Sequence, residues 1–225
     1  MRTWIKTFLL IFFIPCSGLK AQCYFPDRAG TTLEYVRKYV KDGKFCWRHM
    51  LTVTGVEDVD GKRKVTTSSR FLKVNGKPLY DSDVLESVYV DDEGNVHGDV
   101  GESLASYIKA RVGVNATGTG DFSALPYDMQ PGDTLPTVTA KVKVGPLTYT
   151  VRVHDRKVLR EETISLPGGT FKCMVVKVRR DESGPGYHRE VITDTWYCPG
   201  RGYARHDTYR KGKVETSEML YSVKR

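Results

Sequence analysis

The chain has 225 residues, of which 28% are charged and 40% hydrophobic, and its formal net charge is +8. This length is sufficient for one domain, or two small ones, with a proper hydrophobic core. The Lys and Arg residues alternate with Thr, Asp and Glu along predicted strands and form no basic block, so nucleic acid is excluded as an expected partner.

The N-terminal segment has the residue order of a secretory signal peptide. Arg2 and Lys6 precede an apolar stretch, residues 8–14, and a proline and several small residues follow. A transmembrane helix needs about 20 apolar residues, and this stretch is much shorter. We therefore expect residues 1–21 to be a cleaved signal peptide and residues 22–225 to be a single β domain. The mature protein is then exported, periplasmic or associated with the cell surface, and not an integral membrane protein.

The first part of the mature chain is predicted to form an antiparallel meander. Three turn dipeptides, which end in Gly43, Gly61 and Gly76, separate runs in which apolar and polar residues alternate. Such dipeptides between alternating runs are typical of β-hairpins. The predicted strands of this part cover residues 33–41, 44–55, 65–74 and 84–90.

One helix is predicted, within Gly101–Val112. Leu104, Tyr107 and Ile108 recur there at intervals of three and four residues, which is the spacing of one helix face. The next segment, Gly113–Asp121, is rich in Gly and Thr, and we expect a flexible loop. Because predicted strands lie on both sides of it and neither half looks complete, we prefer one domain.

The most regular pattern lies between Pro131 and Cys173. Val138, Ala140 and Val142 alternate with Thr and Lys, and the alternation resumes after a Gly-Pro turn. Successive side chains of a strand face opposite sides, so this pattern predicts a sheet with one apolar and one polar face. About eleven strands are predicted in all. The predicted fold class is all-β: a strongly twisted antiparallel sheet that forms a barrel or half-barrel, with at most one short helix.

Four cysteines remain after removal of the signal peptide, and an even number in an exported chain favours two disulfide bonds. Folding the segment between Cys173 and Cys198 about its polar turn places these two opposite each other, and Cys23 then pairs with Cys46. Pairing of Cys23 with Cys173 and of Cys46 with Cys198 is the alternative, and the sequence leaves both open. No pair has CxxC spacing and the histidines form no HxxxH-type pair, so we expect no metal site.

No common catalytic motif is present: the sequence has no GxSxG, no GxGxxG and no GxxxxGK[ST]. Glu161 and Glu162 are adjacent in a predicted strand, so their carboxylates face opposite sides and cannot act as a pair. We expect a protein that is not an enzyme and that has no catalytic residues and no cofactor.

Aromatic residues are frequent near the C-terminus. In a closed or half-closed barrel, such side chains are able to line a pocket for an apolar or glycan-like ligand. The simpler interpretation is that they fill the core. The candidate ligand-binding residues are Tyr187, Trp196, Tyr203 and Tyr209.

Several motifs resemble the TapB-like family of exported proteins, which carry a domain of unknown function and occur in Bacteroides-type bacteria. These motifs are CYFPDRAGTTLEY (23–35), PGDTLP (131–136), RKV (156–158), SLPGGTFKC (165–173) and WYCPGRGY (196–203). The resemblance implies an all-β, barrel-like fold in the cell envelope, and it supplies no catalytic residues.

These observations together predict an exported, non-catalytic β protein of the cell envelope that binds an apolar or glycan-like ligand. The expected ligand is a lipid or a glycan. The alternative is a protein-interaction or scaffold module of the envelope, which binds a protein partner through exposed strand edges or loops and has no small-molecule ligand.

Overall fold

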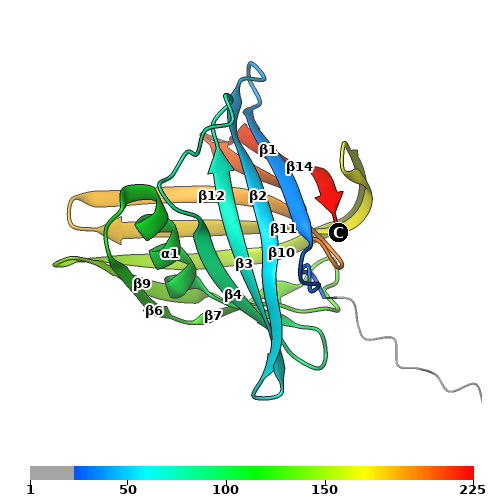
Figure 1. Cartoon of the computed structure of the whole chain (residues 1–225), viewed down its shortest axis with the longest axis horizontal. Coiled ribbons are helices and arrows are strands. Elements are labelled where there is room, and N and C mark those ends of the chain that lie inside the picture. Colours follow the sequence, from blue (N-terminus) through cyan, green and yellow to red (C-terminus); the bar gives the residue numbers. More distant parts are fainter. Residues whose placement is uncertain (1–22) are drawn as a thin grey trace, which may run out of the picture.

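The computed structural model describes residues 23–225 as fourteen strands and one helix (Figure 1). The strands belong to one antiparallel sheet, which curls into a nearly closed barrel. The predicted all-β barrel or half-barrel with one short helix is therefore confirmed. The expected signal peptide, residues 1–21, lies outside the described residues and stays a prediction.

The sheet is formed by fourteen strands, and the single described helix lies between the fifth and the sixth. The strands are β1 (Thr32–Tyr39), β2 (Phe45–Val59), β3 (Lys62–Leu72), β4 (Val84–Val90), β5 (Val96–Asp99), β6 (Ala116–Gly120), β7 (Phe122–Leu125), β8 (Thr134–Leu135), β9 (Val138–Val144), β10 (Leu147–Leu166), β11 (Gly169–Gly184), β12 (Tyr187–Cys198), β13 (Gly202–Arg210) and β14 (Lys213–Lys224). The helix, α1, spans Val100–Val112 between β5 and β6, where the sequence predicts it.

The sheet has the order β6-β9-β10-β11-β12-β13-β14-β1-β2-β3-β4-β5-β7, and β8 pairs with β10 in addition. Its two ends, β6 and β7, are consecutive in the chain and are separated only by Asp121. Residues 116–125 therefore form one bent strand, whose first half pairs with β9 and whose second half pairs with β5. This bent strand runs across the gap between the two ends of the sheet, and each of its halves pairs with one neighbour.

The expectation of a flexible loop over Gly113–Asp121 is wrong, because β6 lies within it. The glycines of this segment permit close approach rather than flexibility. A Cβ atom on Gly118 would overlap the carbonyl of Gly101 in α1, and one on Gly120 would lie 2.6 Å from the Cα of Ala140 in β9. The glycine-rich composition of this segment therefore reflects close packing within a strand and not a flexible loop.

Helix α1 begins and ends at well-defined caps. Asp99 is the N-cap, and its side chain accepts a hydrogen bond from the Glu102 backbone N–H at 2.9 Å. Gly113 ends the helix with a φ of 72°, a left-handed conformation that glycine adopts at low cost. The helix packs against β4, β6 and β9, so it covers the region where the bent strand joins the sheet.

Strands β1–β4 run across the direction of the long strands β9–β12 in Figure 1, and the hydrophobic core lies between these two sets. Val138, Ala140 and Val142 of β9 are each only 1% exposed. The predicted apolar face of this strand is therefore confirmed.

One disulfide bond, Cys173–Cys198, connects β11 and β12, where the two residues lie opposite each other. The Cys23–Cys46 bond and the alternative pairings are not found, and both thiols are free. Cys23 is buried beside Val53 of β2, whereas Cys46 lies seven residues earlier on that strand, roughly 23 Å away at about 3.3 Å per residue. A disulfide needs Cα atoms within about 7 Å, so these two cysteines are too far apart.

Candidate functional site

An apolar hollow of about 220 Å³ lies inside one end of the barrel and is partly open to solvent. Its lining comes from segments that are far apart in the sequence: the N-terminal segment, β1, β2, β4, β5, β7, β12 and β13. The apolar residues of its wall include Phe25, Leu51, Val88, Val96, Leu125 and Tyr197. Among the described residues, only Ser123 and Arg201 bring polar side-chain ends other than tyrosine hydroxyls to it.

Residues 23–27, which we call the strap, form one side of the hollow. The strap is fixed at its start, where the Cys23 carbonyl accepts a hydrogen bond from the Gly200 N–H at 2.6 Å. Tyr24 is buried in a hydrophobic cluster, and Asp27 forms an ion pair with Arg63 of β3. Because both ends of the strap are held, its middle residues form a stable wall.

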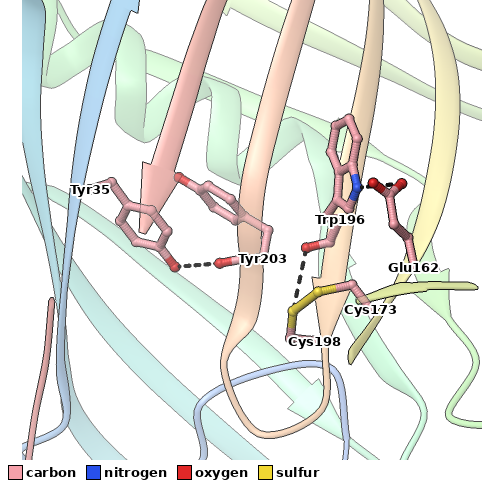
Figure 2. The surroundings of a disulfide bond; sticks show 6 residues. All are labelled: Tyr35, Glu162, Cys173, Trp196, Cys198 and Tyr203. Carbon is pink, nitrogen blue, oxygen red and sulfur yellow. Dashed lines mark hydrogen bonds between the residues drawn. A yellow bond between two sulfur atoms is a disulfide. The ribbon is translucent and has the colours of Figure 1, made fainter. Parts of the chain in front are cut away.

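Two tyrosines form another part of the wall of the hollow. Tyr35 of β1 and Tyr203 of β13 stack with ring centroids 4.4 Å apart, and the Tyr35 hydroxyl donates to the Tyr203 carbonyl at 3.0 Å (Figure 2). Tyr35 is 1% exposed. Burial raises the pKa of both phenols, so both stay neutral and contribute apolar ring surface.

A buried polar cluster lies directly behind these tyrosines. Its centre is Glu218 of β14, which is 5% exposed and accepts hydrogen bonds from His49 Nδ1 at 3.2 Å and Arg37 Nη1 at 3.3 Å. The Tyr203 hydroxyl lies 3.3 Å from His49 Nδ1. Burial raises the pKa of Glu218, but the hydrogen bond from His49 and the charges of His49 and Arg37 outweigh it, so the net pKa is below the ordinary value.

Ser69 of β3 extends this cluster into a serine–histidine–carboxylate arrangement. Its hydroxyl lies 3.0 Å from His49 Nε2, on the ring side opposite Glu218. The order of groups is that of a hydrolase triad. However, Ser69 is 3% exposed, lies in the middle of a strand and does not border the hollow. A substrate carbonyl therefore has no route to its hydroxyl in this structure.

The structure does not bring the four candidate ligand-binding residues together. Tyr203 alone borders the hollow. Trp196 does not border the hollow; it donates from Nε1 to Glu162 at 3.1 Å and packs beside the disulfide (Figure 2). Tyr209 donates to Asp194 at 2.7 Å, and Tyr187 is 42% exposed at the β11–β12 hairpin. For Trp196 and Tyr209, the interpretation as core or structural residues describes these contacts better.

Sequence reasoning missed the strap and the β1–β2 side of the site. The alternation of Leu33, Tyr35 and Arg37 places these side chains on one strand face and was a usable signal. Nothing in the local pattern shows that Glu218 of β14 lies beside Arg37, because that contact depends on which strands are neighbours. Among residues 23–225, no group of His, Cys, Asp and Glu side chains is arranged to hold a metal ion.

No helix in the described part of the chain is long and apolar enough to cross a membrane. Residues 28–220 match the family described as DUF3108-like. No curated protein matches the chain. The TapB-like name expected from the sequence motifs does not occur among these matches.

Two solved structures resemble this fold. One is a Bacteroides fragilis protein classed as exported and as having a YmcC-like fold, with a TM-score of 0.72 and 22% identity over 91% of this chain and 100% of that chain. The other is a Parabacteroides distasonis protein classed as a lipoprotein, with a TM-score of 0.73 and 20% identity over 91% and 99%. At such identities the similarity establishes the fold alone.

Proposed function

The chain belongs to the DUF3108-like family, and we propose that it is an exported, non-catalytic protein of the cell envelope that binds an apolar ligand inside its barrel. The observation that carries this proposal is the apolar hollow between the strap and the Tyr35–Tyr203 pair. Empty apolar space lowers stability because its lining loses packing contacts, so a hollow at this position is more readily understood as a binding site.

The lining favours an apolar ligand over a glycan. A sugar presents many hydroxyl groups, each of which needs a hydrogen-bond partner when it leaves water. The hollow offers few such partners, since Ser123 and Arg201 are its main polar side chains besides the tyrosines. Its volume of about 220 Å³ is also below the range of roughly 300–1,000 Å³ typical of small-molecule pockets. A slender ligand such as a single alkyl chain fits this space.

Four further observations support export or a non-catalytic role. The N-terminal residues have the order of a signal peptide, and the Cys173–Cys198 disulfide is typical of an oxidising compartment. The two similar structures are classed as an exported protein and a lipoprotein. The inaccessible position of Ser69 supports a role other than hydrolysis.

Displacement of a fluorescent probe tests the proposal. The mature protein is mixed with the neutral apolar dye N-phenyl-1-naphthylamine, and dodecanol is added as a competitor. Gly98→Leu fills the hollow, because Gly98 borders it and a Cβ there meets only an ordinary contact with Val88 at 3.7 Å. Gly55→Leu is the matched control, since Gly55 is also a strand glycine with free space, 4.0 Å from the Thr66 Cβ, and does not border the hollow.

We expect dye fluorescence to rise with the wild type and with Gly55→Leu, to fall again with dodecanol, and to stay low with Gly98→Leu. A folded wild-type protein that leaves the dye unaffected contradicts the proposal. Equal dye binding by both glycine variants also contradicts it, because the dye then binds outside the hollow.

Exposed apolar residues at one end of the barrel favour a second candidate, a protein-interaction module. Tyr39 and Val40 at the β1–β2 turn are 46% and 53% exposed, and Val74 after β3 is 79% exposed. The strand edges are less favourable for such a partner, because the bent strand runs between the two ends of the sheet and helix α1 packs against β6. If a partner binds at these loops, the double variant Val40→Ser/Val74→Ser should lose binding and Gly98→Leu should retain it. If a ligand binds in the hollow, Gly98→Leu should lose binding and the double variant should retain it.

A further inference from the structure

We propose that the ligand of the hollow is a single-chain amphiphile with an acidic head group, which Arg201 and Arg28 bind where the hollow reaches the surface. This inference rests on the proposed function, since it names the chemical class of the ligand in the same hollow. The argument depends on the position of Arg201, on the absence of an acidic partner for it, and on the charges around it.

Arg201 is the one cationic side chain that borders the hollow within the described residues. It lies in the turn between β12 and β13 and is partly exposed, so its guanidinium is available to a ligand that enters from solvent. The one hydrogen bond of its side chain among the described residues is a local one, from Nη1 to the Gly200 carbonyl at 3.0 Å. None of the ion pairs among residues 23–225 includes Arg201, so most of its donors remain free.

Two further arginines, Arg28 and Arg225, are near enough to Arg201 for their charges to act on its guanidinium. Arg28 follows the strap directly, and its carbonyl accepts a hydrogen bond from the Thr31 N–H at 3.1 Å. Arg225 follows Lys224, which pairs with Thr32 at the start of β1. The nearby carboxylate of Asp27 is already paired with Arg63. The side-chain charges that act on Arg201 from these two residues are therefore both positive.

The electrostatics agree with this arrangement. Burial lowers the pKa of Arg201, and the like charges of Arg225 and Arg28 lower it further. Such repulsion is unfavourable without a counter-ion, and an anion between the arginines removes it. Guanidinium groups bind carboxylates and phosphates through two parallel hydrogen bonds, so either head group satisfies the free donors of Arg201.

The two halves of the site define the ligand class. The hollow takes a slender apolar chain, and Arg201 at its border meets the polar end of that chain. A neutral alcohol or a cationic amine of the same length fills the hollow equally well but lacks the charge that the arginines require. Among amphiphiles with the same chain, the charge of the head group should therefore determine the affinity.

Competition against N-phenyl-1-naphthylamine, at pH 8 and low ionic strength, tests the inference. The competitors are dodecanoate, monododecyl phosphate, dodecanol and dodecylammonium, which share one chain and differ in the head group. The comparison of dodecanoate with the phosphate shows whether a fatty-acid or a phospholipid-type head group is preferred. Arg201→Gln removes the charge and retains most of the side-chain length, and Arg152→Gln is the control because Arg152 is exposed on β10 and remote from the hollow.

We expect at least one of the two anions to compete about tenfold better than dodecanol with the wild type and with Arg152→Gln. Arg201→Gln should abolish this advantage and leave dodecanol unchanged, and Arg28→Gln should reduce it by a smaller factor. Equal competition by all four amphiphiles, or an undiminished anion preference in Arg201→Gln, overturns the inference while the proposed function stands. Failure of every amphiphile to displace the dye contradicts the proposed function itself.

Discussion

His49 and Glu218 form a buried pair, with Nδ1 and Oε1 3.2 Å apart, although their strands are not neighbours in the sheet. His49 belongs to β2 and Glu218 to β14, and β1 lies between these two strands. The pair therefore crosses β1 on the inner side of the sheet, where Arg37 of β1 also contacts Glu218. This contact connects three strands through side chains and stabilises the wall behind the hollow.

Removal of the Glu218 carboxylate should destabilise the protein strongly. Glu218→Ala leaves Arg37 and His49 without their acidic partner, and loss of one member of a buried pair costs about 3–5 kcal/mol of unfolding free energy. Glu215→Ala on the same strand is the control, because its partner Arg210 is 72% exposed and such surface pairs contribute less than about 1 kcal/mol. Urea unfolding at pH 7 measures both values. Similar losses of unfolding free energy in the two variants would show that the buried pair contributes no more to stability than the surface pair.

Stability should increase with pH because of His206. Burial lowers its pKa to about 4, from 6.5 in the unfolded chain. Between these two values the unfolded state binds more protons than the folded state, so the unfolding free energy falls as the pH decreases from 6.5 to 4. The shift corresponds to about 3 kcal/mol over this window. From about pH 4.5 downward, protonation of Glu218 removes further stability, because the pKa of that carboxyl is lowered from 4.5 in the folded state.

Urea unfolding of His206→Gln from pH 4 to pH 7 checks this pH dependence. The variant should show a flatter profile than the wild type over the window. His188→Gln is the control, since His188 is exposed at the β11–β12 hairpin, and its profile should match that of the wild type. A wild-type slope that persists in His206→Gln would assign the pH dependence to another group.

A methyl group at Gly118 should be costly, because there is no space for it between β6 and α1. Its Cβ would overlap the Gly101 carbonyl, so the helix has to move away from the bent strand. Such overpacking typically costs about 1–3 kcal/mol. Gly55→Ala has free space and should be neutral or slightly stabilising by up to about 1 kcal/mol. Thermal unfolding of both variants is the measurement, and an unchanged midpoint in Gly118→Ala would contradict the tight contact.

The all-β class and the helix follow from local patterns, whereas the sequence leaves the Cys173–Cys198 pairing as one of two alternatives. Alternation, turn dipeptides and the spacing of Leu104 and Ile108 each depend on neighbours in the chain. The closure of the barrel was not predictable in this way. Gly118 and Gly120 give a loop-like signal locally, and only their contacts with Gly101 and β9 explain why glycine is present.

The candidate site was predicted less well than the fold, because it is formed by residues from distant segments. Tyr203 was selected as an aromatic residue and does border the hollow, but Trp196 and Tyr209 lie elsewhere. Composition identifies which side chains are able to form a pocket, whereas strand order decides which of them meet. The strap illustrates the difference, since the segment CYFPD carries no periodic pattern and is nevertheless one wall of the site.

The serine–histidine–carboxylate arrangement should not hydrolyse esters. Ser69 is 3% exposed, and a hydroxyl nucleophile needs a reacting carbonyl about 3 Å away. The His49 ring also stacks on Phe71, with ring centroids 4.4 Å apart, and this contact holds the imidazole in place. We expect p-nitrophenyl butyrate to be hydrolysed at the same background rate by the wild type and by Ser69→Ala. A wild-type rate well above background that disappears in folded Ser69→Ala would instead identify Ser69 as a nucleophile and contradict the non-catalytic role.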